Sequence, residues 1–124
     1  MNLDLLKFAL EDSWNRDTCY PFVSWDSSNP SIGQDEVTSL VVNDFLGGEI
    51  IKSIEEDGIH YYNLVGEEPL DFTNQTSLVK GDIVSRKELL KNKNTALRYF
   101  ILSECVKDSM QNNYKVKEKV YNKI

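Results

Sequence analysis

The fold is decided by residues 47–73, GGEIIKSIEEDGIHYYNLVGEEPLDFT. Within them, β-branched and aromatic residues form three short runs, Glu49 to Ile54, Ile59 to Val65 and Leu70 to Thr73. The dipeptides Asp57-Gly58 and Gly66-Glu67 separate these runs, and both are hairpin signals because tight two-residue turns need backbone with positive φ. This stretch therefore predicts an antiparallel meander of three strands.

Helical patterns precede the meander. Apolar residues recur at steps of three and four from Leu3 to Trp14, which predicts an amphipathic helix from Asn2 to Ser13. A second helix is expected to begin near Gln34, with Val37, Leu40, Val41 and Phe45 on one face. Gly47-Gly48 should end it, because glycine readily adopts the left-handed C-cap conformation.

Two further helices are expected after the meander. Ser85 to Leu90 fits a short helix, and Thr95 can cap a longer one that carries Leu97, Ile101 and Cys105 at steps of four. The expected fold is α+β, with a small antiparallel sheet of about three or more strands packed against helices.

The segment from Asn15 to Ile32 has no sustained period and contains two prolines. We expect an irregular loop held in place by Tyr20, Phe22 and Trp25, and loops of this length often serve a functional site.

The length and charge of the chain limit the classes of function. Its 124 residues suit one domain, which we place at residues 1–110. Residues 111–124 should form a helical or frayed tail, which is basic because it contains four lysines and one glutamate. A net charge of −6 argues against general nucleic-acid binding. No run reaches the roughly 20 apolar residues of a membrane span, so we expect no insertion into membranes. Cys19 and Cys105 lie far apart and suggest neither a zinc site nor a disulfide framework, so a reducing cytoplasm fits best.

His60 is the single histidine and the strongest candidate for proton transfer near neutral pH. If Gly66 and Glu67 form a two-residue turn, Tyr62 pairs with Asp71, which places Asp71 on the face of His60 and diagonal to it. Asp71 could then orient the imidazole by accepting a ring proton, whereas a one-residue slip would move it to the other face.

An ordered series of motifs spans nearly the whole chain before the tail. They are Trp25-x3-Asn29-Pro30-x2-Gly33-Gln34, Val37-Thr38, Leu40-Val41-Val42, Gly47-Gly48-Glu49-Ile50, His60-Tyr61-Tyr62-Asn63, Asp71-Phe72-Thr73, Glu88-Leu89-Leu90 and Thr95-x2-Arg98-Tyr99. This series resembles the YunG-like family of small bacterial proteins. In that family Gly-Gln is usually followed by Cys, and the resemblance implies a papain-like Cys, His, Asp order. Here Asp35 stands at the cysteine position, with His60 and Asp71 after it.

The absence of the thiol favours a binding protein over an enzyme. We expect a pocket that holds a small-molecule ligand, such as a nucleotide-derived signal of the kind a phage protein would sequester against host immunity, without cofactor or metal. The candidate ligand-binding residues are Trp25, Gln34, Asp35, His60, Tyr61, Tyr62, Asn63, Asp71, Arg86 and Arg98. The two arginines are the expected partners of an anionic group.

Other hypotheses stay open. Asp35, His60 and Asp71 are candidate catalytic residues for hydrolysis of a glycosidic or N-ribosyl bond, because carboxylates stabilise oxocarbenium-like centres. Cys19 could replace the missing thiol, although nothing in its surroundings indicates activation. The chain could also be a protein-interaction module that uses a sheet edge or the basic tail, and the sequence leaves homo-oligomerisation open.

Overall fold

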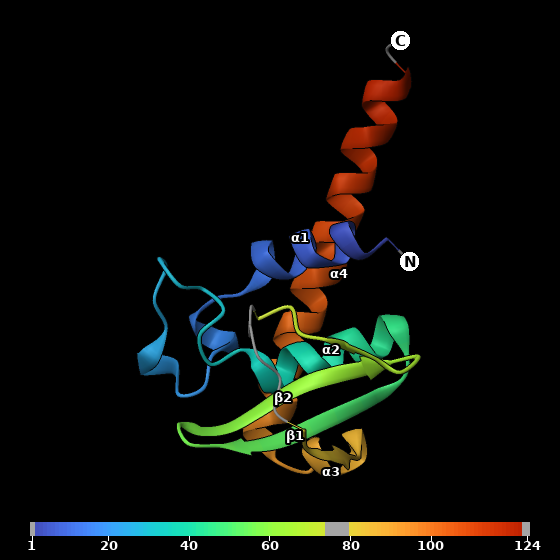
Figure 1. Ribbon diagram of the computed structural model, residues 1–124. Coiled ribbons are helices and arrows are strands. Elements are labelled where there is room, and N and C mark those ends of the chain that lie inside the picture. Colours follow the sequence, from blue (N-terminus) through green and yellow to red (C-terminus); the bar gives the residue numbers. More distant parts are fainter. Residues whose placement is uncertain (1, 74–79, 123–124) are drawn as a thin grey trace.

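The computed structural model describes the backbone of residues 2–73 and 80–122, with side chains as far as residue 112 in the last helix (Figure 1). The helices are α1 (Leu3–Ser13), α2 (Asp35–Leu46), α3 (Arg86–Leu89) and α4 (Lys93–Asn122). The strands are β1 (Glu49–Glu55), β2 (Gly58–Val65), β3 (Glu68–Leu70) and β4 (Asp82–Val84). The predicted α+β class, with an antiparallel sheet packed against helices, is confirmed.

The sheet has the order β3-β2-β1-β4, and every pairing is antiparallel. Val65 pairs with Glu68, so Gly66 and Glu67 form a two-residue turn as predicted. Both have positive φ, 54° and 70°, which is the type I′ geometry that matches the twist of the flanking strands. This turn sets the register of the chain that follows β2.

The strands differ from the prediction at two places. The third strand is Glu68–Leu70 and does not extend to Thr73, because the Asp71 carboxylate accepts hydrogen bonds from the backbone and hydroxyl of Thr73 and turns the chain. Strand β4 was not predicted, since three residues are too short to show a period. It lies beside β1, and Gly81 leads into it where a Cβ would stand 2.2 Å from the Lys52 carbonyl oxygen.

The core lies between the helices and the sheet. Leu6 and Leu10 of α1, Val37 and Val41 of α2, and Leu102 of α4 are fully buried in one cluster. Helix α2 lies against β2, and α1 crosses α4 on the side of α2 away from the sheet (Figure 1). The N-terminus of α2 is thereby brought close to β2 and to the start of α4.

The helix predictions hold with one exception. Asn2 caps α1 by accepting from the backbone of Asp4 and Leu5, and Ser85 caps α3. The predicted cap of the long helix is wrong: α4 begins at Lys93, and Asn92 accepts the backbone N–H of Thr95. The Thr95 side chain is used instead in a contact to α2 described below.

The predicted anchors of the irregular loop are also wrong in part. Tyr20 and Phe22 are 63% and 58% exposed, and Trp25 is half-buried. Thr18 and Cys19 are the buried residues of this segment, and the Cys19 sulfur lies 3.3 and 3.1 Å from the carbonyl oxygens of Pro21 and Ile32, which share its one proton. A small buried thiol that ties two turns together gives no periodic signal, which explains why the sequence pointed to the aromatic residues.

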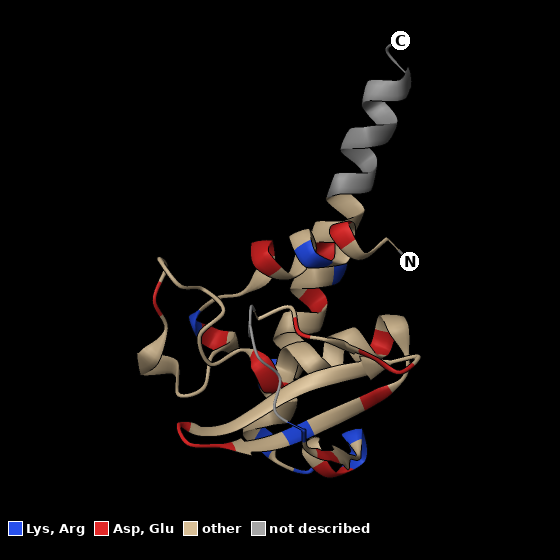
Figure 2. Cartoon of the chain, viewed as in Figure 1, with Lys and Arg blue, Asp and Glu red and all other residues tan. Residues whose placement is uncertain are grey.

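Figure 2 shows acidic residues at the two hairpin turns and basic residues around α3. The helical backbone of α4 continues to Asn122, while the contacts of the basic side chains expected beyond residue 112 lie outside the described residues. Within the described part of the chain, no helix is both long and apolar enough to cross a bilayer.

Candidate functional site

His60 lies between two carboxylates. Its Nε2 atom is 2.6 Å from Oδ2 of Asp71, and its Nδ1 atom is 3.1 Å from Oδ2 of Asp35. The imidazole is 15% exposed, the Asp71 side chain 4% and the Asp35 side chain 23%. The three groups form a partly buried ionic cluster in which both ring nitrogens are engaged.

Asp35 reaches the cluster from the N-terminus of α2. Strand β3 pairs only with Asn63–Val65, and among the described residues no strand pairs with the edge of β2 beyond it. The backbone N–H of Tyr61 at that edge donates to Oδ2 of Asp35 over 2.9 Å. The carboxylate therefore satisfies a strand edge and contacts His60 with the same oxygen atom, while its position in the first turn of α2 suits its negative charge.

Asp71 reaches His60 through the two-residue turn. The predicted pair of Tyr62 with Asp71 is not part of the ladder, because the pairing of β2 with β3 ends at Asn63 and Leu70. Asp71 directly follows Leu70, and its carboxylate contacts His60 as expected from the sequence. Its second oxygen, Oδ1, accepts from the backbone N–H and hydroxyl of Thr73 at 2.9 and 2.6 Å. Three polar contacts thus hold a nearly buried carboxylate and leave it little freedom.

The two carboxylates determine the protonation of His60. Hydrogen bonds from the ring to Asp35 and Asp71, together with their negative charges, raise the pKa of His60 from 6.5 to about 10, against the opposing effect of burial. Burial acts to raise the pKa of Asp71, but the hydrogen bonds from His60 and Thr73 outweigh it and lower the pKa. At neutral pH the cluster is one imidazolium between two carboxylates.

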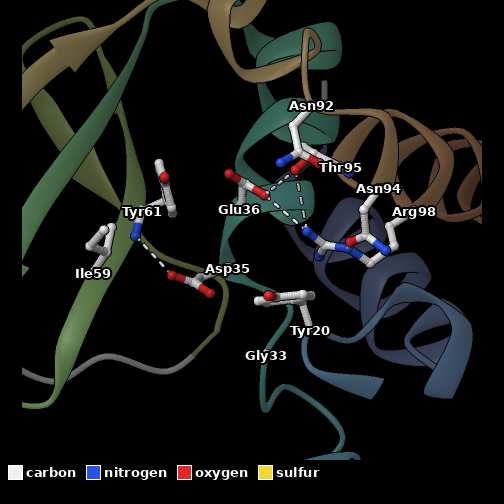
Figure 3. Close-up of a pocket in the computed structure, with 10 residues that line it drawn as sticks. All are labelled: Tyr20, Gly33, Asp35, Glu36, Ile59, Tyr61, Asn92, Asn94, Thr95 and Arg98. Carbon is white, nitrogen blue, oxygen red and sulfur yellow. Dashed lines mark hydrogen bonds and ion pairs between the residues drawn. The ribbon is translucent and has the colours of Figure 1, made fainter. Parts of the chain in front are cut away.

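A pocket of about 400 Å³ lies beside this cluster (Figure 3). It is bounded by the N-terminus of α2, the first half of β2, the irregular loop and the start of α4. Its lining residues are Tyr20, Gly33, Asp35, Glu36, Ile59, Tyr61, Asn92, Asn94, Thr95 and Arg98. Asp35 is the residue that joins the pocket to the cluster.

Arg98 belongs to the wall of the pocket that α4 forms. Its side chain is 6% exposed, and its guanidinium donates to Glu36 Oε1 at 3.0 Å and to Asn94 Oδ1 at 2.7 Å. Weaker contacts join it to Thr95 and to the carbonyl oxygen of Thr18, and the Tyr20 ring lies 5.2 Å from its central carbon. Almost all of its donors are used within the protein.

Glu36 and Tyr61 complete the polar wall. Oε1 of Glu36 accepts from the hydroxyl of Thr95 at 2.8 Å as well as from Arg98, so one carboxylate ties α2 to α4. Figure 3 shows Glu36 between Tyr61 and Arg98. Burial, followed by the charge and hydrogen bond of Glu36, raises the pKa of Tyr61 to about 12, so its hydroxyl is a donor at neutral pH.

Three of the candidate residues line the pocket: Asp35, Tyr61 and Arg98. His60 and Asp71 contact each other, and His60 contacts Asp35, but neither lines the pocket. The remaining candidates lie elsewhere. The Asn63 amide donates to the Ser39 carbonyl oxygen in the interior, and the fully buried Gln34 donates to that of Asn15. Trp25 and Tyr62 are also outside the lining.

Arg86 lies outside the lining of the pocket. It pairs with Asp44 at 2.8 Å, donates to Asn43 and lies over the Tyr99 ring. Sequence reasoning treated Arg86 and Arg98 alike, and it missed seven lining residues, Tyr20, Gly33, Glu36, Ile59, Asn92, Asn94 and Thr95. Among these, the alternation of Ile59 and Tyr61 on one strand face was the available signal.

No three or more His, Cys, Asp and Glu side chains among the described residues are placed to hold a metal ion. A family model described as YunG protein matches residues 2–111. The "Uncharacterized protein YunG" of Bacillus subtilis (strain 168) is 34% identical over 73 residues, which are 59% of this chain and 61% of that protein. The match thus spans less than two thirds of that relative. No solved structure matches significantly.

Proposed function

The chain belongs to the YunG family, and from this premise we propose that it is a small-molecule binding protein that leaves its ligand chemically unchanged. The observation that carries this proposal is the double engagement of His60. A general base needs a free ring nitrogen near its working pH, and here each nitrogen faces a carboxylate while the pKa is about 10.

The position of Asp35 supports the same proposal. The family resemblance implies a thiol there, followed by His60 and Asp71 in a papain-like order. The carboxylate in its place uses Oδ2 to accept from Tyr61 and to pair with His60, which is a structural use of that atom. The cluster thus stabilises the wall of the pocket, and the pocket beside it keeps the volume that a small molecule needs.

The charges narrow the class of ligand. The lining contains two carboxylates, Asp35 and Glu36, and one guanidinium, Arg98, so its net charge is −1. The neighbouring pair of His60 and Asp71 has no net charge and leaves that sum unchanged. Arg98 uses almost all of its donors within the protein and offers little to a phosphate. We propose that an uncharged or cationic ligand with a planar hydrogen-bonding face binds here, so that a nucleotide-derived signal would be held through its nucleoside part.

This proposal is tested by calorimetric titration of the protein with the four common ribonucleosides and their 5′-monophosphates. At least one nucleoside should bind, more tightly than its monophosphate, and mass spectrometry should recover it unchanged. Tight binding through the phosphate, or binding of none of the nucleosides, would contradict the proposed ligand class.

Two exposed aromatic residues of the loop give a matched pair of variants. Tyr20 lines the pocket and Phe22 does not. Tyr20→Ala should weaken nucleoside binding about tenfold, in the range of one lost aromatic stacking partner, whereas Phe22→Ala should leave it unchanged. Equal effects of the two variants would place the ligand outside this pocket.

One observation favours a hydrolase as second candidate. Two carboxylates, Asp35 and Glu36, line the same pocket, and no described group donates to Oδ1 of Asp35. Such a pair could stabilise an oxocarbenium-like centre at an N-ribosyl bond. Release of a free base from the nucleoside, abolished in both Asp35→Asn and His60→Gln, would establish this activity and overturn the binding proposal.

A further inference from the structure

The carboxylate of Asp35 offers a ligand one free acceptor. Its Oδ2 atom is used twice within the protein, by the backbone N–H of Tyr61 at 2.9 Å and by Nδ1 of His60 at 3.1 Å. No described residue donates to its Oδ1 atom, and this atom is not buried. Figure 3 shows it turned away from Tyr61, on the side of the Tyr20 ring. Because Asp35 lines the pocket, Oδ1 is placed to accept from a bound molecule.

Two asparagines at the start of α4 offer donors to the same pocket. Oδ1 of Asn92 accepts from the backbone N–H of Thr95 at 3.1 Å, and Oδ1 of Asn94 accepts from Nε of Arg98 at 2.7 Å. These bonds fix the orientation of both amides, because only the oxygen of an amide accepts. Both asparagines are exposed and line the pocket, and their NH₂ groups form no hydrogen bond with any described residue.

The Tyr20 ring lies between Asp35 and Arg98 in Figure 3. It is 63% exposed, and the guanidinium carbon of Arg98 lies 5.2 Å from its centre. An exposed aromatic ring gives a planar base a surface for stacking, but stacking accepts every base because each has a π-face. The choice between bases therefore falls to the polar groups of the lining.

We propose that Asp35 selects a nucleobase that carries an exocyclic amino group, such as cytosine, and rejects uracil. This inference rests on the nucleoside binding proposed above and names the bases that the pocket takes. The amino group donates to Oδ1 of Asp35, and a ring carbonyl such as O2 of cytosine accepts from the NH₂ group of Asn92 or Asn94. Each polar group of the base then faces a partner of the opposite kind.

Uracil has the size and shape of cytosine but carries a carbonyl oxygen in place of the amino group. Beside Oδ1 of Asp35 that oxygen cannot donate, so two acceptors would face each other. The ring N–H of uracil gives no way around this conflict, because it lies between two carbonyl oxygens that would both approach the carboxylate. Hydrogen bonds to a charged group are the stronger class, so cytidine should bind at least about tenfold more tightly than uridine.

The test is calorimetric titration with three nucleosides of nearly equal size: cytidine, uridine and pyrimidin-2-one riboside. The last is cytidine without its amino group, so it removes the donor and adds no acceptor. It should also bind at least about tenfold more weakly than cytidine. The titrations are run at pH 6, where an imidazole with its ordinary pKa of about 6.5 is already mostly protonated.

Asp35→Asn should reverse the preference between cytidine and uridine. The N–H of Tyr61 and the protonated Nδ1 of His60 both donate to the position of Oδ2, so the amide oxygen must lie there. The NH₂ group then takes the position of Oδ1, where it donates to the uracil carbonyl and opposes the amino group of cytosine. Uridine should bind this variant about threefold more tightly than cytidine, since the new hydrogen bond is between neutral groups.

Asp57→Asn is the matched control, because it removes the same charge from an exposed residue outside the lining. It should keep the preference of the parent protein for cytidine. Partial unfolding of a variant lowers the affinity for both nucleosides by the same factor, so it cannot produce a reversal. Thermal unfolding of each variant without nucleoside checks its fold.

The outcomes separate this inference from the function on which it rests. Equal affinities of the parent protein for cytidine, uridine and pyrimidin-2-one riboside would overturn selection by Asp35 and leave nucleoside binding standing. A folded Asp35→Asn variant that still prefers cytidine would overturn it as well. Failure of every nucleoside to bind the parent protein would overturn both proposals.

Discussion

The Nε2 atom of His60 lies 2.6 Å from the Oδ2 atom of Asp71, a residue 11 positions later in the chain. The contact exists because the turn at Gly66 and Glu67 sets the register that places Asp71 diagonal to His60. With Asp35 on the other ring nitrogen, the histidine is positively charged at neutral pH. The cluster therefore contributes to stability, and that contribution depends on pH.

We expect stability to fall in the alkaline range. The pKa of His60 is raised from 6.5 to about 10 in the folded protein, so its stabilisation is fully present below pH 6.5 and is lost as the pH rises through 10. The loss should amount to a few kcal/mol, on the order of 1.4 kcal/mol for each pH unit in that window. Urea unfolding at pH 6, 8 and 10 measures it.

The control for this prediction is His60→Gln, which removes the titrating group. Its unfolding free energy should change much less between pH 6.5 and 10 than that of the parent protein. Parallel pH dependences of the two proteins would show that His60 has an ordinary pKa.

The two carboxylates should differ in their effect on stability. Asp71→Asn should lower the free energy of unfolding by about 3 kcal/mol. The Asp71 side chain is 4% exposed, and the substitution removes the charge that forms the shorter contact with the buried imidazolium. Asp35→Asn should cost about 1–2 kcal/mol, since that side chain is 23% exposed and better solvated. Chemical unfolding at pH 7 compares them, and a larger loss in Asp35→Asn would contradict this order.

Gly33 is the glycine that the pocket wall requires. Its φ is +67°, and a Cβ there would lie 2.6 Å from both the Cys19 sulfur and the Tyr20 carbonyl oxygen. Gly33→Ala should therefore cost at least about 3 kcal/mol, from strain and overpacking together. Gly47 is the matched control, because its φ is +70° and a Cβ would meet nothing within 4 Å.

Gly47→Ala should cost only about 1 kcal/mol, the strain of the backbone conformation alone. Thermal unfolding of both variants provides the comparison. Similar losses in the two would mean that the close approach of Cys19 and Tyr20 to Gly33 does not exist in solution.

The turn at Gly66 and Glu67 made the contact of His60 with Asp71 predictable from sequence. A dipeptide with hairpin chemistry sets the pairing of its neighbours, and the period of a strand then assigns each side chain to a face. The helices were predictable for a similar reason, because their apolar residues repeat within one segment. Local patterns were sufficient wherever the partner lies a few residues away.

The wall of the pocket was not predictable in this way. Glu36 accepts hydrogen bonds from Thr95 and Arg98, which lie 59 and 62 positions further along the chain. No local sequence pattern predicts a contact between residues so far apart. For the same reason Arg86 and Arg98 were indistinguishable in sequence. One pairs with Asp44 at the surface and the other closes the pocket.

These two arginines give a further prediction. Arg98→Lys should lower the free energy of unfolding by about 2 kcal/mol. Lysine cannot reproduce the planar set of donors that reaches Glu36, Asn94 and Thr95 in this nearly buried site. Arg86→Lys should cost less than about 1 kcal/mol, since that side chain is 34% exposed. Equal losses in thermal unfolding would contradict the role given to Arg98.

The most direct test of the account is an NMR titration of the His60 ring. Because His60 is the single histidine, its ring ¹⁵N signals need no assignment by mutation. We predict that both ring nitrogens are protonated at pH 7.5 and that the titration midpoint lies near pH 10. A neutral ring at pH 7.5, with a midpoint near 6.5, would leave a nitrogen free to act as a base and would contradict the claim that this site binds without catalysing.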